Sequence, residues 1–176
     1  MKKVLVVIDM QNDFIDGALG TGEAVAIVPA VVDEIRKDYN LVIATRDTHY
    51  EDYLNTNEGR HLPVAHCIKD SDGWQIADGV MSALNEKEEL KIIDKPTFGT
   101  ADLCQILMAY DAENGIGSIT LIGLCTDICV VTNALLIKTA FPETPVYVKP
   151  DCCAGVTPET HDAALQTMKM CQVDLI

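Results

Sequence analysis

Three residues that lie far apart in the 176-residue chain have side chains suited to nucleophilic catalysis: Asp9, Lys95 and Cys129. A cysteine thiol acts as a nucleophile once a base accepts its proton, and the Asp9 carboxylate is a suitable base. The Lys95 ammonium would hold that carboxylate and help keep a thiolate charged. Each residue alone also has a common structural role, as a buried apolar cysteine, a loop-capping acid or a surface lysine. The hypothesis therefore depends on the three side chains meeting in space.

A second group of acidic and histidine residues has the composition of a metal site. Asp47 and His49 are two residues apart, which places their side chains on the same side of an extended segment. Glu58, His61 and His66 follow in the same polar stretch, which holds three of the four histidines. Carboxylate and imidazole ligands suit zinc, manganese or iron(II). The alternative is a solvated loop with scattered histidines.

Short apolar runs rich in β-branched residues alternate with longer amphipathic segments, so strands and helices should alternate along the chain. The expected strands are Val4–Ile8, Leu41–Thr45, Lys91–Ile93, Ile119–Leu124, Val146–Val148 and Val173–Ile176. The expected helices hold the apolar face of Val28, Val31, Val32 and Ile35, the segment Trp74–Leu84, the residues after the caps Thr100 and Thr157, and Cys129–Ala140. This alternation predicts a three-layer α/β fold, in which helices cover both faces of a parallel sheet.

Ligands bind beyond the carboxyl ends of the strands in such sheets, so the residues that follow each strand are informative. In strand order these are Asp9, then Asp47 and His49, then Lys95, then the turn Gly123–Asp127 before Cys129, and last Asp151 with Cys152 and Cys153. Both groups of reactive residues should therefore gather at one edge of the sheet. Cys129 is expected in the first turn of its helix, where backbone N–H groups would lower the thiol pKa and stabilise an oxyanion.

The composition narrows the class of protein. The formal net charge of −14 at pH 7 disfavours binding to nucleic acids and to anionic membranes. No apolar stretch approaches the roughly 20 residues that a membrane span needs, and Val4–Ile8 is too short for the core of a signal peptide. The length fits a single domain that spans residues 1–176. Seven cysteines without an export signal are expected to be reduced thiols in the cytoplasm.

Three other classes of function fit parts of the pattern. A phosphoryl-transfer enzyme also uses an acid after the first strand, but it usually needs a second acid two residues later, where this chain has Gln11. A dinucleotide-binding oxidoreductase needs G-x-G-x-x-G after that strand, and Gly17, Gly20 and Gly22 do not have this spacing. A binding module without catalysis is an alternative on the same fold. The intact set of base, lysine and nucleophile disfavours it.

The chain resembles the nicotinamidase/isochorismatase-like cysteine hydrolases. The resemblance rests on three motifs, each at an expected strand end: Asp9-x-Gln-Asn-Asp-Phe14, Lys95-Pro-Thr-Phe-Gly99 and Gly123-Leu-Cys-Thr-Asp-Ile-Cys-Val130. It implies a six-stranded parallel sheet flanked by helices and a catalytic triad of Asp9, Lys95 and Cys129. It also implies a cis peptide bond between Leu124 and Cys125, and an oxyanion hole formed by the backbone N–H groups of Cys125 and Cys129.

Nicotinamidases of this family carry a metal that binds the pyridine nitrogen of the substrate, and the resemblance implies such a site here. Asp47, His49 and His66 match its ligands, Glu58 fits a fourth ligand that some members use, and His61 is the second choice for that place. The implied cofactor is a divalent metal, zinc in the first place, with iron or manganese as alternatives. The residues expected to bind substrate are Phe14, Leu19, Phe98 and Leu124.

The resemblance implies hydrolysis of nicotinamide to nicotinate and ammonia through a cysteine thioester, in NAD metabolism. Two positions depart from the pattern of nicotinamidases: Pro63 stands where an aromatic residue is common, and Asp70-Ser71 replaces Gly-Thr. Leu62 or Trp74 would then cover the ring. The alternative substrates are another small amide, a carbamoyl compound or isochorismate, although the acid and histidine residues favour nicotinamide. By analogy with the family, the chain is expected to form a homodimer or homotetramer.

Overall fold

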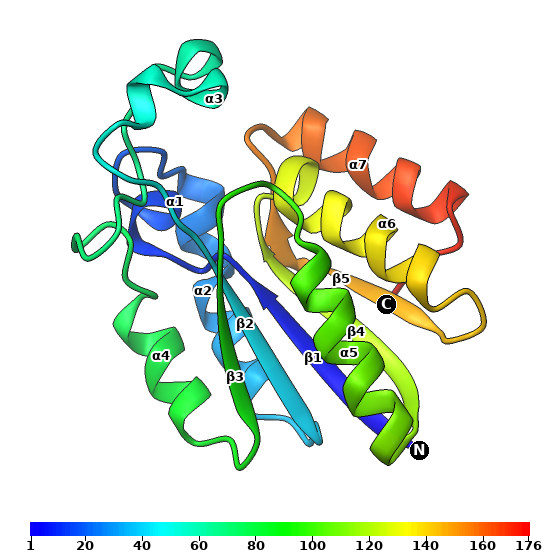
Figure 1. Ribbon diagram of the computed structural model, residues 1–176. Helices are drawn as coiled ribbons and strands as arrows, with labels where there is room; N and C mark the ends of the chain where they lie inside the picture. Colours follow the sequence, from blue (N-terminus) through cyan, green and yellow to red (C-terminus); the bar gives the residue numbers. More distant parts are fainter.

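A computed structural model describes residues 1–176 of the protein. Six parallel strands form one continuous sheet through its centre (Figure 1). The strands are β1 (Lys2–Ile8), β2 (Leu41–Asp47), β3 (Leu90–Lys95), β4 (Ile116–Leu124), β5 (Val146–Ala154) and β6 (Asp174–Leu175). Their order across the sheet is β3-β2-β1-β4-β5-β6, and each neighbouring pair is parallel. The α/β fold with a six-stranded sheet predicted from the sequence is confirmed.

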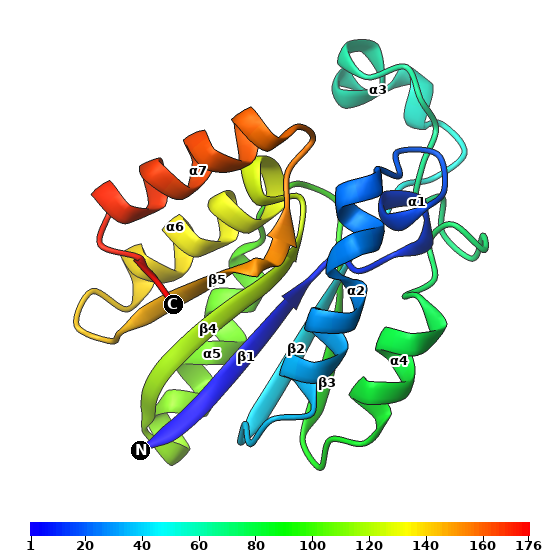
Figure 2. The ribbon, with the colours of Figure 1, turned by 180° about the vertical axis from the view of Figure 1, so that it is seen from behind.

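Helices cover both faces of the sheet, as the opposite views in Figures 1 and 2 show. One face packs against α2 (Gly22–Ile35) and α4 (Asp78–Asn85), and the other packs against α5 (Ala101–Asn114), α6 (Val131–Ala140) and α7 (Pro158–Met170). The short helices α1 (Asn12–Ile15) and α3 (Asn57–His61), with a 3₁₀ turn at Tyr53–Asn55, lie beyond the carboxyl ends of the strands. None of the helices is both long and apolar enough to cross a bilayer.

The central strand β1 is continuously apolar because both of its faces are covered. Val4, Val6 and Ile8 belong to the core under α5, α6 and α7, whereas Leu5 and Val7 belong to the core under α2 and α4. All five side chains are buried. The strand therefore holds a fixed position between β2 and β4, and the residue that follows it, Asp9, emerges at the middle of the carboxyl edge.

Four helices begin at threonine caps. The hydroxyl groups of Thr21, Thr56, Thr100 and Thr157 each accept a backbone N–H from the first turn of α2, α3, α5 and α7. At α7 the cap is a capping box with Thr160, and Pro158 occupies the first turn. The helix starts predicted at Thr100 and Thr157 are confirmed.

The helix predicted over Trp74–Leu84 begins later, at Asp78. Trp74 is held outside the helix by its indole N–H, which donates to the Thr48 hydroxyl at 2.9 Å, and by its carbonyl oxygen, which accepts from Gln11 at 2.9 Å. These contacts tie the segment before α4 to the ends of β1 and β2. The apolar spacing marks the buried face of α4 correctly, but it does not reveal that residues 74–77 lie outside the helix.

The strand β5 is longer than its apolar core indicates. The sequence predicts Val146–Val148, with Asp151, Cys152 and Cys153 beyond the strand, whereas β5 continues to Ala154. After an irregularity in the register, Cys153 and Ala154 pair with the last two residues of β4. Cys152 and Cys153 are buried in the two helix-covered cores. The prediction that these residues follow the strand is therefore wrong.

Candidate active site

The side chains of Asp9, Lys95 and Cys129 meet at the carboxyl edge of the sheet, and we call these residues the nucleophile cluster. The Lys95 ammonium lies 2.7 Å from Oδ2 of Asp9 and 3.5 Å from Sγ of Cys129. It also donates to the carbonyl oxygen of Thr97 at 3.1 Å. The other Asp9 oxygen accepts a hydrogen bond from the Thr45 hydroxyl at 2.6 Å. The structure thus brings together the acid, the amine and the thiol that the sequence singled out.

Different strand ends carry the three members of this cluster. Asp9 follows β1 directly, Lys95 is the last residue of β3, and Cys129 follows β4 after a turn. Gly123 makes the approach of β4 to β1 possible. It has a φ of 118°, and a β-carbon at this position would collide with the carbonyl oxygen of Ile8. Only glycine combines this backbone conformation with so close a contact.

The turn after β4 presents Cys129, and we call residues Thr126–Val130 the nucleophile turn. It has π-helical geometry, in which the N–H of Val130 donates to the carbonyl oxygen of Cys125 at 3.0 Å. The helix predicted to begin at Cys129 begins at Val131, so Cys129 lies in this wider turn before α6. Such wide turns are frequent at functional sites. The cis peptide bond between Leu124 and Cys125, which the family resemblance implied, is present.

The electrostatic environment of Cys129 differs from the expectation. Burial raises the pKa of the Cys129 thiol well above its usual value, and the negative charge of Asp9 raises it further, while Lys95 acts in the opposite direction. Burial also raises the pKa of Asp9, against the effect of Lys95. The prediction that the helix end lowers the thiol pKa is therefore wrong, because Cys129 is only 4% exposed and loses its hydration. Burial therefore favours the thiol form of Cys129 over the thiolate.

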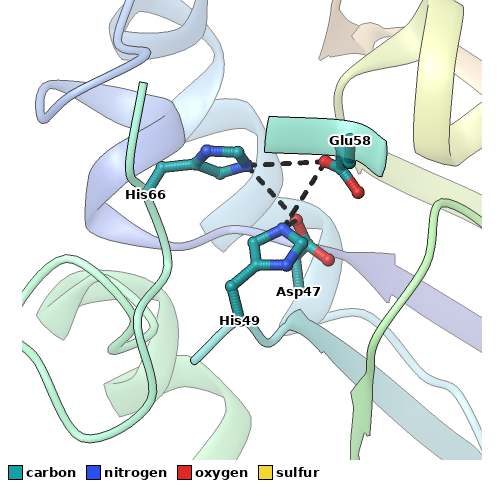
Figure 3. A group of neighbouring side chains, drawn as sticks. All are labelled: Asp47, His49, Glu58 and His66. Carbon is teal, nitrogen blue, oxygen red and sulfur yellow. Dashed lines mark hydrogen bonds and ion pairs between the residues drawn. The ribbon is translucent and has the colours of Figure 1, made fainter. Parts of the chain in front are cut away.

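A second set of side chains converges beside the nucleophile cluster (Figure 3). We call Asp47, His49, Glu58 and His66 the acid–histidine cluster. Nε2 of His49 lies 3.1 Å from Oδ2 of Asp47 and 3.5 Å from Oε1 of Glu58. Nε2 of His66 lies 3.6 Å and 3.9 Å from the same two oxygens. Asp47 ends β2 and His49 follows it, Glu58 comes from α3, and His66 lies between α3 and α4, so three separate segments build this cluster.

The spacing of the acid–histidine cluster fits a tetrahedral divalent metal. Ligand atoms about 2.1 Å from zinc are about 3.4 Å apart in a tetrahedron, and the four donor atoms here all lie within 4.8 Å of one another. Nδ1 of His66 is hydrogen-bonded to the carbonyl oxygen of Val64 at 2.8 Å, which leaves Nε2 free to act as a ligand. Oδ1 of Asp47 is buried and makes no hydrogen bond. The residues present therefore suit a metal.

The charge state of Asp47 agrees with a role as a metal ligand. Burial raises the pKa of this carboxyl, but the contacts with His49 and His66 and the charge of Lys95 together outweigh burial and hold the pKa well below its usual value. The carboxylate is therefore ionised at neutral pH. His61, the second choice for the fourth ligand, stands apart. It is exposed, and its Nδ1 is hydrogen-bonded to the carbonyl oxygen of Asn57 at 2.8 Å.

Gln11 holds the end of β2 in place, a role that sequence reasoning missed. The residue is fully buried. Its Nε2 donates to the carbonyl oxygens of Asp47 at 2.8 Å and of Trp74 at 2.9 Å, and its Oε1 accepts the N–H of Asp47 at 2.7 Å. The amide thus clamps the backbone of a metal-ligand candidate on both sides. The signal in the sequence is a polar amide directly after a buried strand, where it needs partners.

The same motif after β1 also supports His66. Oδ2 of Asp13 accepts the N–H of Cys67, the residue after His66, at 2.7 Å. The Phe14 ring meets the His66 ring edge-on, with 5.5 Å between the ring centres. Asp9, Gln11, Asp13 and Phe14 lie within one short motif, yet only Asp9 contacts Lys95. The other three position the segments that carry the acid–histidine cluster or its ring walls.

Both clusters border one cavity of about 230 Å³. Its walls include all four residues predicted to bind substrate, namely Phe14, Leu19, Phe98 and Leu124. Asp47, Glu58 and His66 of the acid–histidine cluster line it, as do Cys125 and Cys129. No lysine or arginine is among the lining residues, and most of the wall is apolar. The cavity therefore suits a small, uncharged and largely apolar molecule.

Of the two residues considered as covers for a substrate ring, only Leu62 lines the cavity. Trp74 is buried elsewhere: its ring lies under the guanidinium group of Arg46, 3.7 Å from the ring centre. Its indole N–H is engaged with Thr48. The prediction that Trp74 serves as the alternative cover is therefore wrong. Pro63, at the position where an aromatic residue was expected, does not line the cavity either.

Comparison with known proteins shows similarity along almost the whole chain. The family model described as the isochorismatase domain matches residues 3–176. A nicotinamidase/pyrazinamidase of Mycobacterium tuberculosis is 26% identical over 184 aligned positions, which cover 99% of this chain and 98% of that protein. The similarity is therefore not confined to the three motifs.

Two solved structures extend this comparison. A pyrazinamidase of Pyrococcus horikoshii, solved in complex with zinc, has a TM-score of 0.83 and 29% identity, with coverage of 100% of this chain and 99% of that one. An N-carbamoylsarcosine amidase of Thermoplasma acidophilum has a TM-score of 0.76 and 29% identity, with coverage of 99% and 95%. Both proteins are named as amidases.

Proposed function

We propose that this chain, which belongs to the isochorismatase family and is an amidohydrolase of that family, acts on nicotinamide. The products would be nicotinate and ammonia. The observation that carries the proposal is a single small cavity bordered by both the nucleophile cluster and the acid–histidine cluster. One cluster offers a thiol beside a carboxylate, and the other offers nitrogen and oxygen ligands for a metal. A heteroaromatic amide needs both.

The cavity supports this substrate over the alternatives. Its volume of about 230 Å³ lies below the roughly 300–1,000 Å³ of sites for drug-sized ligands. Its apolar walls suit an uncharged ring. Isochorismate and N-carbamoyl amino acids carry carboxylates, and no lysine or arginine lines the cavity to pair with them. A neutral aromatic amide therefore fits better than either alternative.

In the proposed first half-reaction, Asp9 accepts the proton of the Cys129 thiol as the sulfur attacks the amide carbonyl carbon. Proton transfer and attack occur together, because burial disfavours a free thiolate. The N–H groups of Cys125 and Cys129 stabilise the oxyanion of the tetrahedral intermediate. Asp9 then gives its proton to the departing nitrogen, the carbon–nitrogen bond breaks, and ammonia leaves a thioester on Cys129.

In the second half-reaction, water attacks the thioester carbonyl carbon while Asp9 accepts one of its protons. The carbon–sulfur bond breaks, and Asp9 returns the proton to the sulfur of Cys129. The acid product leaves and ionises to nicotinate. Lys95, 2.7 Å from Asp9, keeps the carboxylate in place through both halves and balances its charge. The thiol and the carboxylate end as they began.

Asp47, His49, Glu58 and His66 would hold a divalent metal. Two imidazole nitrogens and two carboxylates suit zinc in the first place, with iron or manganese as alternatives. A zinc complex of a similar pyrazinamidase supports this choice. When bound, the metal supplies a Lewis acid for a ring nitrogen of the substrate. Phe14 and Leu124 then act as apolar walls beside the ring.

Ammonia release from a small panel of amides tests the proposed substrate. The panel contains nicotinamide, benzamide, N-carbamoylsarcosine and acetamide, each with and without a chelator. We expect nicotinamide to be turned over fastest, and benzamide, which lacks the ring nitrogen, to be a poor substrate that a chelator affects little. Faster turnover of N-carbamoylsarcosine than of nicotinamide would replace the proposal by its carbamoyl alternative.

Substitution of the nucleophile tests the mechanism. Cys129→Ala should abolish turnover of nicotinamide, because no other thiol has the contact with Lys95. Cys171→Ala is the matched control, since Cys171 is an exposed free cysteine outside the cavity, and it should keep the wild-type rate. Rapid acid quenching followed by peptide mass spectrometry should show an acyl group on Cys129. Wild-type activity in the Cys129→Ala protein would contradict the scheme.

We also propose a cytoplasmic location and a single domain, on the seven free cysteines and on the family model that matches residues 3–176. The expectation of a homodimer or homotetramer stays a prediction. Light scattering coupled to size-exclusion chromatography would give the mass of the assembly, and a mass near 19.2 kDa would show a monomer instead.

A further inference from the structure

Asn133 joins two segments of the active site through one fully buried side chain. It lies in α6, one helical turn after Cys129. Its Nδ2 donates to the carbonyl oxygen of Cys129 at 2.8 Å and to that of Phe98 at 3.0 Å. Its Oδ1 accepts the N–H of Thr100 at 3.1 Å. Both ends of the amide are therefore satisfied, and all of its partners belong to the surroundings of the cavity.

The two segments that Asn133 joins both contribute to the cavity wall. The nucleophile turn contributes Ile128 and Cys129, and the loop of residues 96–100 between β3 and α5, which we call the Phe98 loop, contributes Phe98. Phe98 is 44% exposed, so its side chain receives limited support from packing. Hydrogen bonds to its backbone from Asn133 therefore matter for its position.

The Phe98 loop also accepts a hydrogen bond from Lys95 and packs closely against α6. The carbonyl oxygen of Thr97 accepts from the Lys95 ammonium at 3.1 Å. At Gly99, a β-carbon would lie 2.6 Å from Cγ2 of Thr132 and 2.8 Å from Cδ1 of Leu136, so the loop backbone touches α6 there. A shift of the loop away from α6 would therefore move both a cavity wall and a partner of the amine.

We infer that Asn133 is a positioning residue that fixes the distance between the nucleophile turn and the Phe98 loop, and so sets the width of the substrate cavity beside Cys129. A buried asparagine is often no more than a satisfied core residue. Here every partner is a backbone group of the two cavity-lining segments or of their immediate ends, which favours the more specific role. The inference deepens the proposed amide hydrolysis and rests on the same site.

Two substitutions distinguish the bond of Asn133 to the nucleophile turn from its two bonds to the Phe98 loop. Asn133→Ser keeps a hydroxyl that can donate to the carbonyl oxygen one turn earlier, as Thr132 does to Ile128 at 2.6 Å and Thr139 does to Leu135 at 2.8 Å. A serine side chain is too short to bridge to the Phe98 loop. Asn133→Asp keeps the shape but replaces the donor to both carbonyl oxygens by an acceptor.

The matched control is Asn114→Asp. Asn114 is the last residue of α5, and its Nδ2 donates to the carbonyl oxygen of Tyr110, one turn earlier, at 3.2 Å. The bond is of the same type as that between Asn133 and Cys129, but it lies outside the cavity. Asn114 is exposed, whereas Asn133 is buried, so this variant controls for loss of the bond type and not for the burial of a carboxylate.

The experiment uses the full chain loaded with zinc and measures kcat and KM for nicotinamide. In Asn133→Ser we expect KM to rise with little change in kcat, because the loop is released while the nucleophile turn is kept. In Asn133→Asp we expect kcat/KM to fall by about tenfold to a hundredfold, the usual effect of a misplaced reacting group. Asn114→Asp should stay within about twofold of the wild type. Wild-type KM in a folded Asn133→Ser protein would overturn the inference.

A second readout does not require turnover. Cys129 is alkylated with iodoacetamide and with a bulky N-aryl iodoacetamide, and peptide mass spectrometry gives both rates. In Asn133→Ser the cavity should widen, so the alkylation rate with the bulky reagent should rise relative to the rate with the small one. An unchanged ratio of the two rates would contradict the inference. If the wild type hydrolyses no amide, the proposed function fails, yet this ratio still decides the role of Asn133. If Asn133→Asp does not fold, Asn133→Ser alone decides it.

Discussion

The Lys95 ammonium lies 3.6 Å from Oδ1 of Asp47, so the amine of the nucleophile cluster also contacts a carboxylate of the acid–histidine cluster. The two residues are paired neighbours at the ends of β3 and β2. Burial acts against the charge on Lys95, but the carboxylates outweigh it and raise the pKa of the ammonium above its usual value. The single positive charge of Lys95 thus stabilises the carboxylates of both Asp9 and Asp47, so the charges of the two clusters depend on each other.

Replacing that cation should destabilise the protein as well as inactivate it. In Lys95→Met the carboxylates of Asp9 and Asp47 lose their common cation inside the protein. We expect the free energy of unfolding to fall by about 3–5 kcal/mol, the usual cost of breaking a buried ion pair from one side. Urea denaturation of the metal-free protein measures the change.

The control for Lys95→Met is Arg36→Met, which breaks an ion pair with Glu86 in which both side chains are about half exposed. Its cost should stay below about 1 kcal/mol, since exposed pairs contribute little. Equal losses in the two variants would show that Lys95 and the acids do not depend on each other as the structure indicates.

Removing the clamp on Asp47 should weaken metal binding without touching a ligand. Gln11→Leu removes all three hydrogen bonds of a fully buried amide, two of them to the backbone of Asp47. Loss of such supporting contacts typically lowers metal affinity by about 10- to 100-fold. Calorimetric titration of the metal-free protein with zinc gives the affinity. Asn12→Ala, which removes only an exposed bond to Asp72, should bind zinc like the wild type.

The fourth ligand position can be assigned by a pair of substitutions. Glu58→Ala should lower zinc affinity, because Oε1 of Glu58 lies 3.5 Å and 3.9 Å from the Nε2 atoms of His49 and His66. His61→Ala should leave it unchanged, because His61 is exposed and bonded to the backbone of its own helix. The opposite pattern in the same titration would restore His61 as the ligand.

The stability of the protein should depend on pH through Glu34, away from the active site. Oε2 of Glu34 lies 2.7 Å from the Lys37 ammonium and 3.0 Å from that of Lys149, and Oε1 accepts from the Tyr39 hydroxyl at 2.6 Å. Burial raises the pKa of this carboxyl, but the hydrogen bonds, with that from Lys37 the strongest, outweigh burial and lower the pKa below its usual value. Glu34 is therefore stabilising in its ionised form.

The sign of the effect follows from this lowered pKa. The stabilisation is complete above the pKa of the unfolded chain, about 4.3, and is lost as the pH falls through the folded-state pKa. At pH 7, Glu34→Gln should cost about 1–3 kcal/mol, as expected for charged hydrogen bonds. Urea denaturation between pH 3 and pH 7 should show the difference from wild type shrinking at the acid end. The exposed Glu88 is the control, and Glu88→Gln should have little effect at any pH.

The positions of Asp9, Lys95 and Cys129 follow from chain order and parallel topology, which is why the sequence predicts their meeting. Strand ends in a parallel sheet share an edge whatever the details of packing. The motif Asp9–Phe14 could likewise be recognised as a unit. The order of the strands across the sheet is not fixed by these patterns, and only the structure gives it.

Side-chain contacts across the fold were beyond such reasoning. Gln11 and Asp47 are 36 residues apart, and Asn133 and Phe98 are 35 apart, so their pairing depends on how helices and loops pack. The predicted direction of the Cys129 pKa shift was wrong for a related reason. Its position near a helix start predicts a lowered pKa, but the depth of burial decides the sign, and depth is a property of the folded chain.

The position of Lys95 on β3 has a consequence for association between chains. β3 is the outermost strand on its side of the sheet, and its free rim is a template on which a strand from another molecule could assemble. The side chains of Lys91 and Asp94 are exposed along it, and such charges discourage strand addition. The same strand ends in the buried amine of Lys95, the residue that follows Asp94, so strand addition at this rim would disturb the active site. Charges that keep the rim unpaired therefore protect both solubility and reactivity.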